Sequence, residues 1–174
     1  MRNLRKLSRA ARHPLRLIGY ILVLGTLLCS CEGTTFSSSV PAYPVNITID
    51  KRALFVDFTP EATNAYVIVN ADGYKKNGKF VIPVTVMDAW GYGGVVVYVS
   101  LSGYVAYDLA CPYCAGKGRK EPCEIEGMNA VCPHCGEEYE LGSGYAIPRK
   151  GISKEALRRL TNLTATSDRI TVRQ

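Results

Sequence analysis

Histidine is almost absent from this chain of 174 residues, which contains only His13 and His134. A serine hydrolase needs a histidine between its serine and a carboxylate, and a phosphate-binding loop places glycines directly before a helix. Neither set can be assembled, because His13 lies in the N-terminal segment described below and the glycines do not precede a predicted helix. We therefore expect no hydrolytic or group-transfer activity.

A long hydrophobic run is also missing. The apolar run from Leu17 to Leu28 has twelve residues, whereas a membrane-spanning helix needs about 20. Basic residues precede this short run, as they do in signal peptides. There are six of them: Arg2, Arg5, Lys6, Arg9, Arg12 and Arg16. Residues 1–30 are therefore predicted to be a signal peptide.

The end of this segment, Leu28-Cys29-Ser30-Cys31, resembles the bacterial lipobox, in which cleavage leaves a lipidated cysteine as the first residue. The resemblance implies a lipid on Cys31 and an anchor in a membrane of the bacterial cell envelope, for which we predict the outer membrane. The alternatives are ordinary secretion with Cys31 in a disulfide, or a retained anchor. Residues 31–44 are rich in Ser, Thr and Pro, and they are predicted to form a flexible tether.

The mature chain has no net charge. Residues 1–30 carry six of the 21 Lys and Arg and none of the 15 Asp and Glu, so fifteen basic and fifteen acidic residues remain. A nucleic-acid-binding domain needs a basic face. We therefore expect no nucleic-acid partner.

Residues 45–174 are predicted to form one all-β domain, because about 130 residues can build a single core. Short apolar stretches, alternating or continuous, predict its strands. These are residues 45–49, 54–58, 66–69, 80–87, 95–100, 104–110 and 138–141, with a last hairpin between 163 and 172. Residues 153–160 fit either one or two helical turns or an extended segment.

Two Cys-x-x-Cys pairs, Cys111 with Cys114 and Cys132 with Cys135, are separated by seventeen residues. We call residues 111–118 the first knuckle and residues 132–136 the second knuckle. Each pair places two sulfurs about one turn apart, and four thiolates suit a tetrahedral zinc ion or a two-iron cluster. The first knuckle is predicted at the end of a strand and the second at the tip of a hairpin.

From about Gly94 onward, the order of parts resembles the Rieske iron-sulfur domain. The parts are a valine-rich strand, a turn, the strand YVAYDLA, a Cys-Pro knuckle, a loop, CPHCG, a strand with Tyr139, then Pro148, a Leu-Arg stretch and a last hairpin. The resemblance implies a small barrel or sandwich with a rubredoxin-like, two-knuckle metal-binding part at about 108–145. It also implies a [2Fe-2S] cluster, a one-electron carrier and an unidentified redox protein as partner.

The chain departs from that family in its ligands. One iron of a Rieske cluster is held by two cysteines and the other by two histidines. Cys111 and Cys132 match the cysteine positions, whereas Tyr113 and Cys135 occupy the histidine positions. We therefore predict an all-cysteine site that includes Cys114. It would hold either a [2Fe-2S] cluster near the roughly −400 mV of all-cysteine ferredoxins or a structural Zn²⁺; two disulfides are the third alternative.

Cys123 and His134 are secondary candidates. Cys123 is predicted to be an unpaired thiol rather than a replacement ligand, and His134 an exposed residue rather than a ligand or a donor to the cluster. The first knuckle also matches one repeat of DnaJ-type chaperones, and its cysteines match a thioredoxin-like redox pair. We set both aside, because the repeat occurs once and because Gly116 and Gly118 oppose the helix that such a pair opens.

The sequence thus predicts a membrane-anchored, Rieske-like iron-sulfur lipoprotein that carries one electron and is not an enzyme by itself. The alternative is a structural zinc-binding or metal-free binding module at the cell envelope.

Overall fold

The computed structural model describes residues 38–52 and 54–174. The predicted signal peptide, Cys31 and the first part of the predicted tether lie outside these residues. Within them, thirteen strands form three antiparallel sheets, accompanied by one short helix. The prediction of an all-β domain is therefore confirmed. Among the described residues, no helix has the length and apolar character needed to cross a bilayer.

The first sheet has four strands in the order β12-β13-β1-β5. Their bounds are β1 (Val45–Asp50), β5 (Ala89–Trp90), β12 (Leu163–Ala165) and β13 (Arg169–Arg173). Ile47 in β1 lies opposite Val172 in β13, and both side chains are buried. The alternation of buried and exposed residues in β1 and the last hairpin agree with the prediction.

The second sheet has five strands in the order β4-β3-β2-β6-β7. Their bounds are β2 (Tyr66–Asn70), β3 (Gly73–Lys76), β4 (Lys79–Ile82), β6 (Val95–Ser100) and β7 (Gly103–Asp108). Every residue of β6 is buried, as its continuous apolar run predicts. Because successive side chains of a strand point to opposite faces, β6 contributes to two cores.

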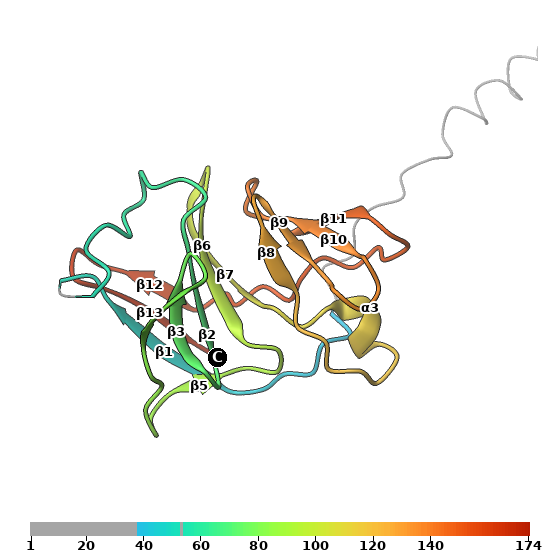
Figure 1. Cartoon of the computed structure of the whole chain (residues 1–174), viewed down its shortest axis with the longest axis horizontal. Coiled ribbons are helices and arrows are strands. Elements are labelled where there is room, and N and C mark those ends of the chain that lie inside the picture. The colour runs from blue at the N-terminus through green and yellow to red at the C-terminus, as the bar shows by residue number, and fades with distance from the viewer. Residues whose placement is uncertain (1–37, 53) are drawn as a thin grey trace, which may run out of the picture. The chain divides into compact units, whose positions relative to one another are not determined.

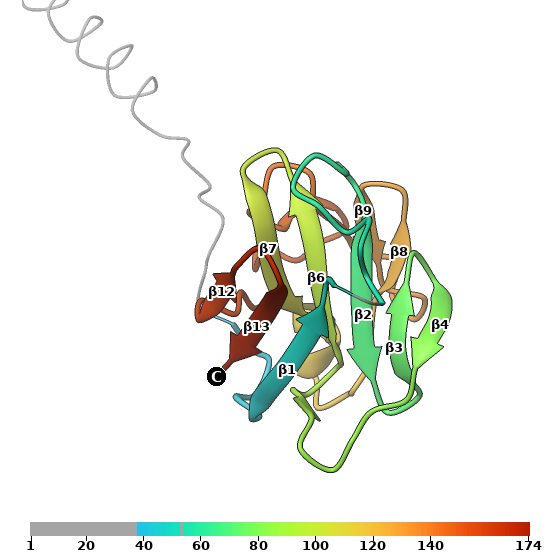
Figure 2. The same cartoon turned by 90° about the vertical axis from the view of Figure 1, so that its left-hand side faces the viewer.

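The third sheet has the order β11-β10-β9-β8 and lies beside the knuckles. Its strands are β8 (Glu124–Glu126), β9 (Asn129–Val131), β10 (Glu138–Glu140) and β11 (Ile147–Lys150), and the short helix is α3 (Pro112–Ala115). Figure 1 shows the five-stranded sheet between the other two, and Figure 2 shows the crossing of β1 and β13 over it.

The five-stranded sheet separates the two cores. Val95, Val97 and Val99 face the first core, with residues of β1, β2 and β13. Val96 and Tyr98 face the second core, which contains the knuckle cysteines. A rigid sheet with both faces covered therefore supports the first knuckle, which directly follows β7.

The strand predicted for residues 54–58 is wrong, and the strand predicted for residues 80–87 is too long. Residues 54–58 form turns, because Phe55 and Phe58 are the buried side chains and the Phe58 N–H donates to the Phe55 carbonyl at 2.9 Å. Leu54 and Val56, which we expected on an inward face, are exposed. The strand predicted for residues 80–87 ends at Ile82, before Pro83, which has no N–H to donate.

The segment 153–160 is extended, one of its two predicted forms. It runs along β7: the Leu160 N–H donates to the Ala106 carbonyl, and the Asp108 N–H donates to the Arg158 carbonyl, both at 2.9 Å. The segment connects β11 with the last hairpin and covers the second core through Leu157.

The last part of the predicted tether, residues 38–44, packs against the domain instead of standing free. The Ser39 N–H and hydroxyl both donate to the Glu155 carboxylate at 2.8 Å. Val40 is buried, and its carbonyl accepts a hydrogen bond from the Arg158 guanidinium at 2.8 Å. Composition alone suggested a tether, but Ser39 and Val40 find partners more than a hundred positions away.

Candidate metal centre

The first knuckle begins where β7 ends. Pro112 occupies the first turn of α3, a position at which its missing N–H costs nothing. The Ala115 N–H donates to the Cys111 carbonyl at 2.9 Å, and the Arg119 N–H donates to the Cys114 carbonyl at 2.9 Å. We argued that Gly116 and Gly118 oppose a helix; one turn nevertheless forms and ends at Ala115, just before them.

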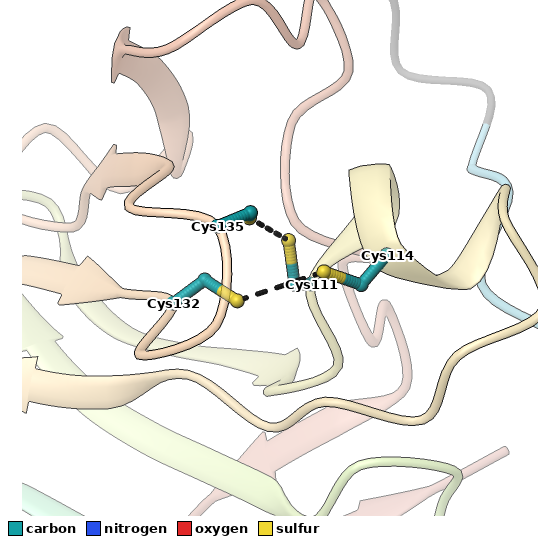
Figure 3. Close-up of side chains that lie close together, drawn as sticks. All are labelled: Cys111, Cys114, Cys132 and Cys135. Atoms are coloured by element: carbon teal, nitrogen blue, oxygen red, sulfur yellow. Dashed lines mark hydrogen bonds between the residues drawn. The ribbon is translucent and has the colours of Figure 1, made fainter.

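The second knuckle is the turn between β9 and β10. The Gly136 N–H donates to the Cys132 carbonyl, and the Cys132 N–H donates to the Glu137 carbonyl, both at 2.9 Å. Gly136 has a φ of +73°, a conformation that favours glycine. This turn directs Cys132 and Cys135 toward the first knuckle (Figure 3).

The structure brings the four predicted ligand residues together. The Sγ atoms of Cys111, Cys114, Cys132 and Cys135 all lie within 4.8 Å of one another. The separation is 3.6 Å from Cys111 to Cys135 and 3.8 Å from Cys114 to Cys132, so both close pairs join one knuckle to the other (Figure 3). Three of these side chains are buried, and Cys135 is half-buried.

The five described cysteines are free thiols rather than disulfides. The two close Sγ–Sγ separations, 3.6 and 3.8 Å, are far longer than a disulfide bond of about 2.05 Å. Four convergent sulfurs can hold a metal ion or an iron-sulfur cluster. The prediction that these four cysteines can form one metal site therefore agrees with the geometry, whichever metal is bound.

Hydrogen bonding and burial shift the pKa values of Cys111, Cys114 and Cys135 in different directions. The Cys111 sulfur accepts hydrogen bonds from the Cys123 thiol and from the Tyr139 hydroxyl, which lies 3.5 Å away. These two donors, Cys123 more than Tyr139, hold the pKa of Cys111 far below the usual range of a thiol. Burial raises the pKa of Cys114 and of Cys135 above that range. Before a metal binds at neutral pH, Cys111 is therefore a thiolate, whereas Cys114 and Cys135 keep their protons.

Cys123 lies outside the group of four. It is buried, and its N–H donates to the Leu109 carbonyl at 2.7 Å, which places its thiol beside Cys111. The thiol thus has a hydrogen-bonding role that we did not predict. We also did not predict that Tyr139 contacts the Cys111 sulfur. The sequence offered a usable signal: Tyr139 is a single aromatic residue between Glu138 and Glu140, on a strand next to the second knuckle.

His134 is exposed, as predicted, and is not one of the four clustered residues. Its Nε2 lies 3.0 Å from Nη1 of Arg119. Arginine can only donate, so Nε2 of His134 is the acceptor in this contact. This contact joins the two knuckles on their solvent side.

Two buried carboxylates position the knuckles, and sequence reasoning missed both. The Asp108 carboxylate accepts hydrogen bonds from the N–H groups of Tyr92, Gly93 and Ala110 at 2.7, 2.8 and 2.9 Å. Burial raises the pKa of Asp108, and these three donors oppose the rise. A charged residue inside the apolar strand YVAYDLA was the available signal.

The second of these carboxylates is Glu137, two residues after Cys135. It accepts hydrogen bonds from the N–H groups of Ile152 at 2.6 Å and Ser153 at 3.0 Å. Gly151 leaves the space for it, since a Cβ at that position would lie 2.2 Å from the carboxylate carbon. Glu137 therefore fastens the second knuckle to the start of the extended segment.

We compared the chain with models of known protein families, with curated proteins and with solved structures, and none of them matches. The site must therefore be interpreted from its own geometry.

Proposed function

We propose that Cys111, Cys114, Cys132 and Cys135 bind one tetrahedral metal ion, Zn²⁺, which joins the two knuckles. The spacing of the sulfurs carries this proposal. Metal–sulfur bonds of about 2.3 Å place the sulfurs at the corners of a tetrahedron with edges of about 3.8 Å. The two close cross-knuckle pairs lie at 3.6 and 3.8 Å, and no pair exceeds 4.8 Å.

A [2Fe-2S] cluster needs a wider site. Two irons and two sulfides then lie between the thiolate pairs, so that sulfurs on different irons stand up to about 6 Å apart. The observed limit of 4.8 Å is shorter than that. Four soft thiolates are a ligand set that zinc prefers, and zinc has no redox chemistry of its own. The proposed role of the ion is structural: it fixes the end of β7 to the turn between β9 and β10.

The second candidate is the one-electron carrier with a [2Fe-2S] cluster and an unidentified redox partner. The resemblance in sequence order to the Rieske domain, noted above, supports it. In the structure β6, β7, the first knuckle, the second knuckle, β10 and the β12-β13 hairpin succeed one another along the chain. For this candidate the knuckles would have to move apart to accept the cluster.

We further propose that the protein is a binding module of the bacterial cell envelope, anchored through a lipid on Cys31. The lipobox-like residues 28–31 support this location. The domain would then be held near the membrane surface rather than within it.

The test is the metal and labile-sulfide content of the mature protein, purified without oxygen. We expect one zinc per chain, no labile sulfide and no visible absorbance. Two irons with two sulfides would establish the carrier instead. A protein that contains no metal, and that binds neither added zinc nor a cluster reconstituted from iron and sulfide, would refute both candidates.

A further inference from the structure

The described chain begins at a point that is firmly attached to the domain. Ser39 is held by the Glu155 carboxylate through two hydrogen bonds of 2.8 Å, and the buried Val40 is held by Arg158. The chain is therefore held to the domain at Ser39 and Val40, eight and nine residues after Cys31.

Two hollows flank this point, and both contain basic side chains. One, of about 370 Å³, is lined by Ser39, Lys117 and Lys154 among others. The other, of about 430 Å³, is lined by Ser38, Leu157, Arg158, Arg159 and Thr161. We call Lys117, Lys154, Arg158 and Arg159 the basic rim.

The basic rim concentrates positive charge on a domain whose predicted mature chain, from residue 31 onward, has no net charge. Lys117, Lys154 and Arg159 are exposed, and Arg158 is half-buried. The ammonium of Lys117 lies 3.9 Å from the centre of the Tyr113 ring, which holds it at the edge of its hollow. The acid that lines these hollows is Glu155, and both of its oxygens accept hydrogen bonds from Ser39. The residues that line the two hollows therefore include four basic side chains and one acidic side chain.

The chain between the proposed anchor and Ser38 is short, so this face can reach the bilayer but cannot move far from it. Seven residues lead from Cys31 to Ser38, and an extended chain of that length spans at most about 25 Å. Basic residues are attracted to anionic headgroups within a Debye length of about 8 Å. We propose that the basic rim binds the phosphate groups of anionic phospholipids and thereby seats the domain on the membrane. This inference rests on the lipid anchor included in the proposed function.

The test uses the mature lipidated protein in two kinds of vesicle, phosphatidylcholine alone and phosphatidylcholine mixed with phosphatidylglycerol. A water-soluble acylating reagent modifies exposed lysines, and mass spectrometry measures the rate at each. Each basic residue at an anionic surface favours the docked state about fivefold. We expect Lys117 and Lys154 to react at least about fivefold more slowly on the anionic vesicles, and high salt to abolish the difference. Lys79, exposed on β4 at the far edge of the five-stranded sheet, is the internal reference.

Charge reversal provides the matched variants. Lys154→Glu with Arg159→Glu is expected to remove the protection of Lys117, whereas Lys51→Glu with Arg52→Glu, which keeps the reference Lys79, should retain it. Equal zinc content and circular dichroism spectra in the three proteins establish that each is folded. Equal reaction rates of Lys117 on the two vesicles would overturn the inference while leaving the anchor intact. A protein that neither vesicle retains would refute the anchor itself, and the inference with it.

Discussion

The affinity of the four-cysteine site for zinc is predicted to rise about a hundredfold for each pH unit near neutrality, because metal binding displaces protons from thiols. Burial raises the pKa of Cys114 and of Cys135, so both thiols keep their protons at pH 7. The pKa of Cys111 is lowered by its donors, so Cys111 releases none in this range. At least two protons are therefore displaced, and each contributes about a factor of ten per pH unit.

Competition with a chromophoric chelator at several pH values between about 6 and 8 measures this slope, with the chelator's own protonation subtracted. The Cys114→Ser variant should bind zinc more weakly and lose about one unit of slope, because one displaced proton is gone. Cys123→Ser is the matched control: it also alters a buried cysteine, but one outside the group of four. The serine hydroxyl can still donate to Cys111 as the thiol does, so this variant should keep the slope. A zinc affinity independent of pH, or the same slope in Cys114→Ser, would refute the reasoning.

Three further predictions concern the surroundings of the site and the core. Tyr139→Phe removes the hydroxyl 3.5 Å from the Cys111 sulfur and should weaken zinc binding about tenfold, as the same chelator assay would show; unchanged affinity would remove Tyr139 from the account. Gly151→Ala places a methyl group against the Glu137 carboxylate at a φ of +111° and should lower the free energy of unfolding by more than about 1 kcal/mol; a wild-type urea midpoint would contradict this. Val97→Ala empties part of the fully buried first core and should cost about 2 kcal/mol in the same urea titration without changing zinc content, whereas loss of zinc would show that the two cores are not independent.

The strands that carry the site were predictable from short-range patterns. Val45, Ile47 and Ile49 alternate along β1 because one face of that strand is buried. The run Val95–Ser100 is continuous because β6 has a core on each face. The convergence of the two knuckles could be predicted, because the sulfurs of Cys-x-x-Cys pairs can bind one metal only when they share a pocket.

The features that escaped prediction depend on contacts between distant residues. Asp108 and Glu137 look like ordinary surface acids until the N–H groups that they bind are known. Ser39 belongs to a polar segment, yet it docks on Glu155. In residues 54–58 the apolar alternation suited a strand, but Phe55 and Phe58 turned out to be the buried pair.

The identity of the metal could not be read from spacing. Two Cys-x-x-Cys pairs serve zinc and iron-sulfur clusters alike. Our proposal of zinc rests on the separation of the sulfurs across the knuckles. That separation is set by how the turn between β9 and β10 faces α3, which no local pattern encodes.

X-ray absorption at the metal edge of the purified mature protein tests the central claim most directly. We predict a zinc edge and a single shell of four sulfurs at about 2.3 Å, with no second metal nearby. An iron edge with a neighbouring iron, or a zinc shell that includes nitrogen or oxygen, would contradict a single tetrahedral ion held by Cys111, Cys114, Cys132 and Cys135.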